Sequence, residues 1–230
     1  MVFMEIKIFP DAETVARESA KIIAAEARLA VAARGQFVVA VSGGKTPWQM
    51  LRALASEDLP WPQVQVAQVD ERIAPAGHAD RNLTHLRESL RHAPLRAGQI
   101  HAMPVEEDDL DAAAANYART LTQLAGVPPV LDLVHLGLGA DGHTASLVPG
   151  DPVLEISDRD AAMTGVYQQR RRMTLTYPLL NRARRILWVV TGGEKAEMLG
   201  RLCAGDRTIP AGRVVTNTAL ALADRAAAGT

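Results

Sequence analysis

Several features that mark particular protein classes are scarce in this sequence. It has a single cysteine, Cys203, so an internal disulfide cannot form and a disulfide-rich secreted domain is excluded. Its 25 basic and 26 acidic side chains nearly cancel, so the chain presents no net field that would attract a nucleic acid or an acidic membrane. We therefore expect no nucleic-acid or membrane partner, and a bound anion must be held by a local site.

Aromatic residues and long apolar runs are also scarce. Aromatic residues form 4% of the chain and hydrophobic residues 48%, with much alanine, valine and leucine. This composition suits helices on a buried parallel sheet better than a β-sandwich. The opening residues, MVFMEIKIFP, lack the basic and apolar regions of a signal peptide, and no uncharged run approaches the roughly 20 residues of a membrane-spanning helix. We expect a cytoplasmic protein, folded as a single domain over residues 1–230 with a sizeable core.

Short apolar runs alternate along the chain with helical patterns. Alanine and apolar positions recur at helical spacing between Asp11 and Arg34, where Gly35 ends the pattern. Further helices are predicted over 109–125 and 194–203, and strands over 37–41, 64–69, 131–136 and 186–190. This order predicts an α/β fold with an open, mostly parallel, Rossmann-like sheet and helices on both of its faces.

The ends of the predicted strands carry the unusual residues. Ligands of such sheets bind beyond the carboxyl ends of the strands, so we expect four segments to converge there: 42–46, 70–72, 137–149 and 192–195. The stretch from Asp151 to Arg172 is mixed in charge and lacks periodicity, which predicts a long active-site loop.

The first of these segments is a glycine loop that precedes a helix. Gly44-Lys45-Thr46 matches the end of a Walker motif, but Val39 occupies the position of the first glycine of that motif, so a nucleotide-binding P-loop is excluded. What remains is a glycine turn at a helix N-terminus, where free N–H groups favour an anion such as phosphate. A tight turn without a ligand is the alternative.

The third segment contains a second glycine pattern. Gly137, Gly139 and Gly142 match G-x-G-x-x-G after a predicted strand. A dinucleotide site also needs a full helix after the glycines, whereas Pro149 and Pro152 interrupt the chain soon afterwards. We therefore expect no nicotinamide cofactor.

The same segment contains Asp141-Gly142-His143-Thr144. A histidine in a glycine-flanked loop at a strand end can accept a proton near neutral pH, so His143 is a candidate general base. No third ligand stands at a metal-binding spacing, so we expect no metal. His135 lies within an apolar strand and is predicted to be a buried structural or supporting residue. The remaining loop histidines are predicted to be solvated: His78, His92 and His101.

The run from Leu136 to Gly150, LGLGADGHTASLVPG, closely resembles the signature of the 6-phosphogluconolactonases, which hydrolyse a lactone in the oxidative pentose phosphate pathway. Four further motifs resemble that family in the same order: VSGGKTP at 41–47, DER at 70–72 with Asn82, RMTLT at 172–176 with Asn181, and GGEKA at 192–196. The sequence departs from the family pattern at Lys45 and Arg81, where serine is common, and at Val148, where phenylalanine is usual.

The resemblance implies a deaminase/lactonase-type fold and hydrolysis of 6-phospho-D-glucono-1,5-lactone to 6-phosphogluconate without a cofactor or a metal. It implies that His143 is the general base that activates water, with Asp141 or Asp70 orienting the ring or polarising the water. Arg72 is expected to bind the substrate or the developing oxyanion. The phosphate is expected to be held by five further residues: Ser42, Gly43, Gly44, Arg172 and Lys195.

Two alternatives remain open. Glucosamine-6-phosphate deaminases share the fold that the resemblance implies, but their loop carries a glutamate before the proline, where this chain has Val148. A sugar-phosphate-binding protein without catalysis is the second alternative, although such a protein has no need for a base in the glycine loop. The expected partner is a small phosphosugar lactone, and the chain is expected to be a monomer or a small homo-oligomer.

Overall fold

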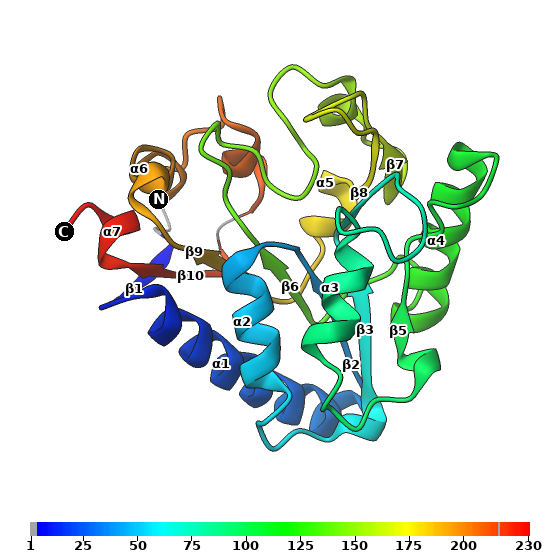
Figure 1. Ribbon diagram of the computed structural model, residues 1–230, viewed down its shortest axis with the longest axis horizontal. Helices are drawn as coiled ribbons and strands as arrows, with labels where there is room; N and C mark the ends of the chain where they lie inside the picture. Colours follow the sequence, from blue (N-terminus) through cyan, green and yellow to red (C-terminus); the bar gives the residue numbers. More distant parts are fainter. Residues whose placement is uncertain (1–3, 216) are drawn as a thin grey trace.

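A seven-stranded parallel sheet forms the centre of the protein (Figure 1). The computed structural model describes residues 4–215 and 217–230. The order of the strands is β1-β10-β9-β6-β2-β3-β5, and every neighbouring pair is parallel. Their bounds are β1 (Glu5–Phe9), β2 (Phe37–Val41), β3 (Val64–Gln68), β5 (Ile100–His101), β6 (Leu133–Leu136), β9 (Ile186–Val190) and β10 (Ala219–Asp224).

The central strands are apolar throughout because the sheet is covered on both faces. Every residue of β2, β6 and β9 is buried. Alternate residues of β2 enter different cores: Val38 and Ala40 pack in one, whereas Phe37, Val39 and Val41 pack in the other. A strand buried on both faces has a continuous apolar sequence, which explains why these strands are visible as apolar runs.

Helices cover the two faces of the sheet. The hydrophobic core that contains Phe37, on one face of the sheet, is completed by three helices: α1 (Ala12–Arg34), α2 (Lys45–Leu54) and α3 (Asn82–Ser89). The hydrophobic core that contains Val38, on the opposite face, is completed by four helices: α4 (Leu110–Ala125), α5 (Tyr177–Leu180), α6 (Ala196–Cys203) and α7 (Arg225–Ala228). The longest of them, α1, begins where the Asp11 carboxylate accepts a 2.7 Å hydrogen bond from the Thr14 N–H, and it ends at Gly35, whose φ is 78°.

A second, smaller sheet follows the carboxyl end of β3. Its order is β4-β8-β7, and both pairs are antiparallel: β4 (Asp70–Arg72), β8 (Arg172–Leu175) and β7 (Ala161–Met163). Short 3-10 turns complete the chain: η1 (Trp61–Gln63), η2 (Ala97–Gln99), η3 (Pro152–Glu155), η4 (Gly193–Lys195) and η5 (Pro210–Arg213). The register of the small sheet places Arg72 directly opposite Arg172, and this pairing brings two distant parts of the chain to one place.

The α/β fold with a mostly parallel sheet is confirmed, and β2, β3, β6 and β9 fall on the four strands that the sequence predicts. The prediction of one long loop from Asp151 to Arg172 is wrong in part. That stretch contains η3 and β7, and Val153, Ala161 and Ala162 are buried in the core. Its apolar residues are few and unevenly spaced, so no periodicity reveals them. Within residues 4–215 and 217–230, no helix is both long and apolar enough to span a membrane.

Candidate active site

A cavity of about 150 Å³ lies where strand ends of the large sheet meet the small sheet. Seven of the predicted site residues line it: Ser42, Gly43, Asp70, Arg72, His143, Arg172 and Lys195. An adjoining cleft of about 540 Å³ shares Gly43 and Lys195 with this cavity and is lined in addition by Gly44. Asp141 lines neither space and lies against His143 instead. The segments predicted to converge therefore do so.

Ser42 follows β2 directly and is fixed by the neighbouring strand β6. Its backbone N–H donates to Nδ1 of His135 over 3.2 Å, and its hydroxyl donates to the carbonyl of the same residue over 3.1 Å. Burial lowers the pKa of His135 to about 3, so this imidazole is neutral and its Nδ1 can accept. His135 is thus a buried supporting residue, as the sequence predicts. His101 differs from the prediction, since it is half-buried in β5 and contacts Gln65.

His143 and Asp141 form a close pair in the loop after β6. Nδ1 of His143 lies 2.6 Å from Oδ1 of Asp141, which also accepts the backbone N–H of His143 over 3.1 Å. Burial of the Asp141 carboxylate opposes its ionisation, but hydrogen bonds from His143 and Tyr167 outweigh this effect and hold the pKa of Asp141 below its usual value. An ionised Asp141 accepts a hydrogen bond from Nδ1–H, which leaves the other ring nitrogen, Nε2, with a free lone pair.

Two glycines allow side chains of the site to lie against the backbone. A Cβ on Gly139 would come within 2.0 Å of Nδ1 of His143, and a Cβ on Gly43 would come within 2.1 Å of Oδ1 of Asn82. Any other residue at either position would displace the side chain that it meets. Close approach therefore requires these two glycines, whereas Gly44 and Gly142 in the same loops have φ of 139° and 82°, which favours glycine for its backbone.

Asp70 does not contact His143. Its Oδ2 accepts a 2.6 Å hydrogen bond from the Ser146 hydroxyl, and its Oδ1 accepts a 3.1 Å bond from the Asn82 side chain. Of the two aspartates that the sequence offers for orienting the ring, only Asp141 is placed to do so. Ser146 lies within the signature run, but nothing in its type or spacing identifies it as the partner of a carboxylate 76 positions away.

Arg72 and Arg172 face the cavity from adjacent strands of the small sheet. Nη1 of Arg72 donates to the Asp80 carbonyl over 3.0 Å, and Nη2 of Arg172 donates to Oε1 of Gln168 over 3.1 Å. The Nε atoms of both arginines are buried without a hydrogen-bond partner among the described residues. Burial and the charge of Arg72 lower the pKa of Arg172. Two like charges placed opposite each other on paired strands destabilise the sheet unless an anion lies between them.

The buried carboxylate of Glu71 in β4 accepts hydrogen bonds from the backbone next to this pair of strands. Glu71 has no exposed surface and accepts the backbone N–H groups of Arg72, Asn82 and Leu83 over 2.7–2.8 Å. Nε of Arg81 lies 3.2 Å from Oε2 of Glu71. Arg81 therefore points away from the cavity, and this departure from the family pattern leaves the lining of the site unchanged.

Lys195 reaches the cavity from the loop after β9. It lies at the end of η4, lines both the cavity and the adjoining cleft, and its ammonium is 4.0 Å from the Glu194 carboxylate. The loop is held by Gly192, whose N–H donates to both oxygens of Asp224 at the end of β10 over 3.1 and 3.2 Å. The side chain of Lys195 is 23% exposed, so its ammonium remains accessible to an anion in the cavity.

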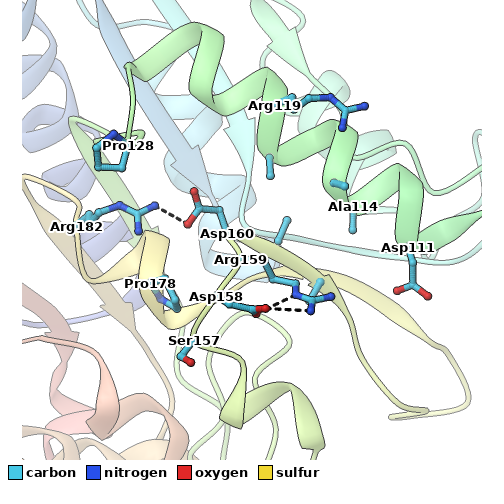
Figure 2. Close-up of a pocket in the computed structure, with 14 residues that line it drawn as sticks. Asp111, Ala114, Arg119, Pro128, Ser157, Asp158, Arg159, Asp160, Pro178 and Arg182 are labelled. Carbon is cyan, nitrogen blue, oxygen red and sulfur yellow. Dashed lines mark hydrogen bonds and ion pairs between the residues drawn. The ribbon is translucent and has the colours of Figure 1, made fainter.

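A larger cavity of about 610 Å³ lies elsewhere, between α4 and the small sheet (Figure 2). Two of its three carboxylates are already paired with arginines, Asp158 with Arg159 and Asp160 with Arg182. No histidine or lysine lines it. The smaller cavity, with its histidine, two arginines and a lysine, is therefore the candidate active site.

Comparisons with known proteins identify the family of this chain. The model of the family Glucosamine-6-phosphate isomerases/6-phosphogluconolactonase matches residues 10–222, which include every residue of the cavity. The chain belongs to this family. A relative from Synechocystis named 6-phosphogluconolactonase is 39% identical over 180 residues, covering 76% of this chain and 75% of the relative.

The overall fold is common to both branches of the family. The solved structure of 6-phosphogluconolactonase from Trypanosoma cruzi has a TM-score of 0.89, with 24% identity and coverage of 100% of this chain and 98% of that one. A monomeric glucosamine-6-phosphate deaminase has a TM-score of 0.86, with 19% identity and coverage of 98% and 99%. The fold therefore does not separate the two activities, and the residues of the cavity must do so.

Proposed function

We propose that this chain hydrolyses 6-phospho-D-glucono-1,5-lactone to 6-phosphogluconate in the oxidative pentose phosphate pathway. The observation that carries the proposal is the meeting of two different groups at one cavity. His143, paired with Asp141 over 2.6 Å, supplies a base, and Arg72 and Arg172 supply positive charge, with Nε atoms that have no hydrogen-bond partner among the described residues. A cyclic ester with a phosphate at its far end needs both an activated water and a hold on the phosphate.

In the first step, His143 acts as general base. Asp141 holds the proton on Nδ1, so Nε2 accepts a proton from a water molecule as the water oxygen attacks the lactone carbonyl carbon. The carbonyl π-electrons move to its oxygen, and Arg72 stabilises the resulting oxyanion. The carbonyl then re-forms as the bond to the ring oxygen breaks, and His143 returns the proton to that oxygen. The product is an open-chain carboxylic acid that ionises in water.

The phosphate is assigned to the basic groups around the cavity. Arg172 offers a planar fork and Lys195 a point charge, and both line the same space. The glycine loop of Gly43 and Gly44 adds N–H groups before α2. Ser42 lines the same cavity, where its hydroxyl must turn from the His135 carbonyl to donate to the phosphate. Holding the phosphate at a distance from the carbonyl fixes the carbonyl in front of His143.

Asp70 takes a different role from Asp141 in this proposal. Asp70 lines the cavity while Ser146 and Asn82 hold both of its oxygens. Its remaining lone pairs can accept a hydrogen bond from the attacking water or from a substrate hydroxyl. We therefore assign the orientation of His143 to Asp141 and the polarisation of the water to Asp70.

The deaminase alternative is less well supported by the loop after His143. Where the deaminases carry a glutamate, this chain has Val148, which is buried and lines neither the cavity nor the adjoining cleft. An apolar side chain cannot carry a proton to a ring oxygen or an amine.

Among the described residues, no three His, Cys, Asp or Glu side chains are grouped to hold a metal ion, so we propose that the reaction needs none.

The decisive experiment is hydrolysis of freshly generated lactone, corrected for its spontaneous opening. The protein should accelerate opening, and exhaustive chelation should leave the rate unchanged. It should release no ammonia from glucosamine 6-phosphate. Ammonia release at a rate that matches lactone hydrolysis would contradict the proposal in favour of a deaminase. Binding of 6-phosphogluconate without any turnover would instead indicate a sugar-phosphate-binding protein.

A further inference from the structure

One side chain that the proposed mechanism does not use contacts three groups that it does use. Tyr167 lies in the segment before β8, and its hydroxyl donates to Oδ2 of Asp141 over 3.1 Å. Its ring packs on the His143 ring in a T-shaped arrangement, with 5.4 Å between ring centroids. The guanidinium of Arg172 lies over its ring face, 5.0 Å from the centroid. Tyr167 therefore joins the base and its aspartate to the phosphate-binding arginine.

The contact with Asp141 completes the set of hydrogen bonds on that carboxylate. Oδ1 faces Nδ1 and the backbone N–H of His143, and Oδ2 faces the Tyr167 hydroxyl. A carboxylate held only through Oδ1 can rotate about its Cβ–Cγ bond and leave the ring. A donor on Oδ2 removes that rotation, as a second partner does for ligating and catalytic carboxylates.

The turn that presents Tyr167 adopts an unfavourable backbone conformation. Tyr167 and Arg170 pair across a two-residue hairpin turn, with N–H···O distances of 2.9 and 3.2 Å. The central residues Gln168 and Gln169 have φ of 49° and 66°. Turns of this kind favour Asn-Gly, because residues with a Cβ pay a steric cost at positive φ. Two glutamines in succession persist here because surrounding contacts hold the turn.

Those contacts connect the turn to the site on both sides. Oε1 of Gln168 accepts from Nη2 of Arg172, and Arg170 donates to Oδ2 of Asp80 through Nε and Nη2 over 3.0 and 2.8 Å. The carbonyl of Asp80 in turn accepts from Arg72. The strained turn is thus tied to both arginines of the cavity as well as to Asp141.

We propose that Tyr167 is a positioning residue that fixes the Asp141 carboxylate beneath His143 through its hydroxyl and the Arg172 guanidinium in the cavity through its ring. The proposal deepens the lactonase function and rests on it. The two roles belong to different atoms of one side chain, so substitutions can separate them. Removing the hydroxyl should impair the orientation of His143 by Asp141. Removing the ring as well should also weaken phosphate binding by Arg172.

The test compares two variants with a control from the same turn. Tyr167→Phe keeps the ring and loses the hydrogen bond to Asp141, so kcat should fall about tenfold while KM stays within about twofold. Tyr167→Leu also removes the surface under Arg172, so KM should rise about three- to tenfold in addition. Val166→Ala, whose side chain is 72% exposed, should leave both constants unchanged.

A spectroscopic measurement separates positioning from general damage. In ¹⁵N NMR spectra of the full chain, His143 should carry its neutral-form proton on Nδ1, and Tyr167→Phe should lower the share of that tautomer while Val166→Ala should not. An unchanged tautomer and an unchanged kcat in Tyr167→Phe would overturn the inference. If the unaltered protein lacks lactonase activity but the tautomer still responds to Tyr167→Phe, the proposed function fails and the positioning of Asp141 by Tyr167 stands.

Discussion

The two sheets supply the candidate active site with different kinds of group. The large parallel sheet contributes loops that follow its strand ends, and these loops carry Ser42, the Asp141–His143 pair and Lys195. The small antiparallel sheet contributes residues from within its strands, namely Asp70, Arg72 and Arg172. Glycines in the loops allow the His143 ring to lie against the backbone, whereas paired strands hold the charged side chains of Arg72 and Arg172 opposite each other.

The difference gives a division between the base, which lies in a loop, and the paired arginines, which lie in strands, while the proposed phosphate site draws on both sheets. A general base must carry its proton on the correct ring nitrogen and lie within hydrogen-bond reach of the reacting atom. A loop that supplies a close hydrogen-bond partner suits this role. Two arginines that bind anionic groups of a substrate must stay close together without the ligand, so rigid strands suit Arg72 and Arg172. Each sheet also contains a fully buried titratable residue that does not line the cavity, His135 in β6 and Glu71 in β4. Four substitutions test whether the division holds.

The largest effect is expected from His143→Ala. Loss of the base should lower kcat about a hundredfold to ten-thousandfold, while the affinity for 6-phosphogluconate changes by no more than about threefold. Rates and product binding are measured on the same preparation, with the exposed His92→Ala as control. Equal losses of turnover and affinity would show that His143 binds the substrate rather than acting as the base.

Glu71→Gln should be the most destabilising change beneath the small sheet. A neutral amide cannot accept all of the N–H groups that point at Glu71, and it leaves the buried Arg81 with less charge compensation, so unfolding free energy should fall by about 3 kcal/mol. Denaturant titration measures the change. Glu106→Gln is the control, because this second partner of Arg81 is 56% exposed and should cost less than about 1 kcal/mol. Equal costs would show that the small sheet does not depend on its buried carboxylate.

Arg172→Gln should weaken 6-phosphogluconate binding about ten- to hundredfold by removing a charge-assisted contact. Affinity for unphosphorylated gluconate should hardly change, and thermal stability should not fall, since the repulsion from Arg72 is relieved. Calorimetric titration of both ligands provides the measurement, and the exposed neighbour Arg171→Gln is the control. Equal weakening of both ligands would place the phosphate elsewhere.

The last prediction concerns stability at acid pH. The pKa of His135 is about 3 in the folded protein, below the ~6.5 of an unfolded histidine, so the unfolded chain binds this proton first. The stability that comes from a neutral His135 is complete above pH ~6.5 and falls on acidification by up to about 1.4 kcal/mol per pH unit until pH ~3. His135→Asn, which retains an acceptor for the Ser42 N–H, should flatten this slope in denaturant titrations from pH 7 to about 5. An unchanged slope would assign the acid sensitivity to other groups.

The sequence predicts the parts of this molecule whose signal is local. Buried parallel strands are continuous apolar runs, and the glycine loops follow them directly, so the large sheet and the residues at its strand ends are recognisable. The edge strand β1, with exposed Ile6 and Ile8, and β10, with its alternating alanines and leucines, have no such distinct signal. The fold class therefore follows from the sequence, but the full width of the sheet does not.

The small sheet cannot be predicted from the sequence, for a different reason. Its three-residue strand β4 consists of charged residues and pairs with β8, about one hundred positions further along the chain. Such pairing is specified by tertiary contacts rather than by propensity. The position of Tyr167 depends on this sheet and on a strained turn, so neither its residue type nor its spacing identifies it as part of the site. The choice between Asp141 and Asp70 likewise needs coordinates.

The close contacts at Gly139 and Gly43 bear on how this protein tolerates mutation. At either position one added methyl group would occupy the place of His143 or Asn82. Loss of function can thus arise at residues that contribute no acid, base or charge, and a screen restricted to titratable side chains would overlook them. A directed-evolution library that aims to admit larger lactones should leave these two glycines unvaried and diversify the exposed residues of the adjoining cleft, such as Lys45 and Glu194.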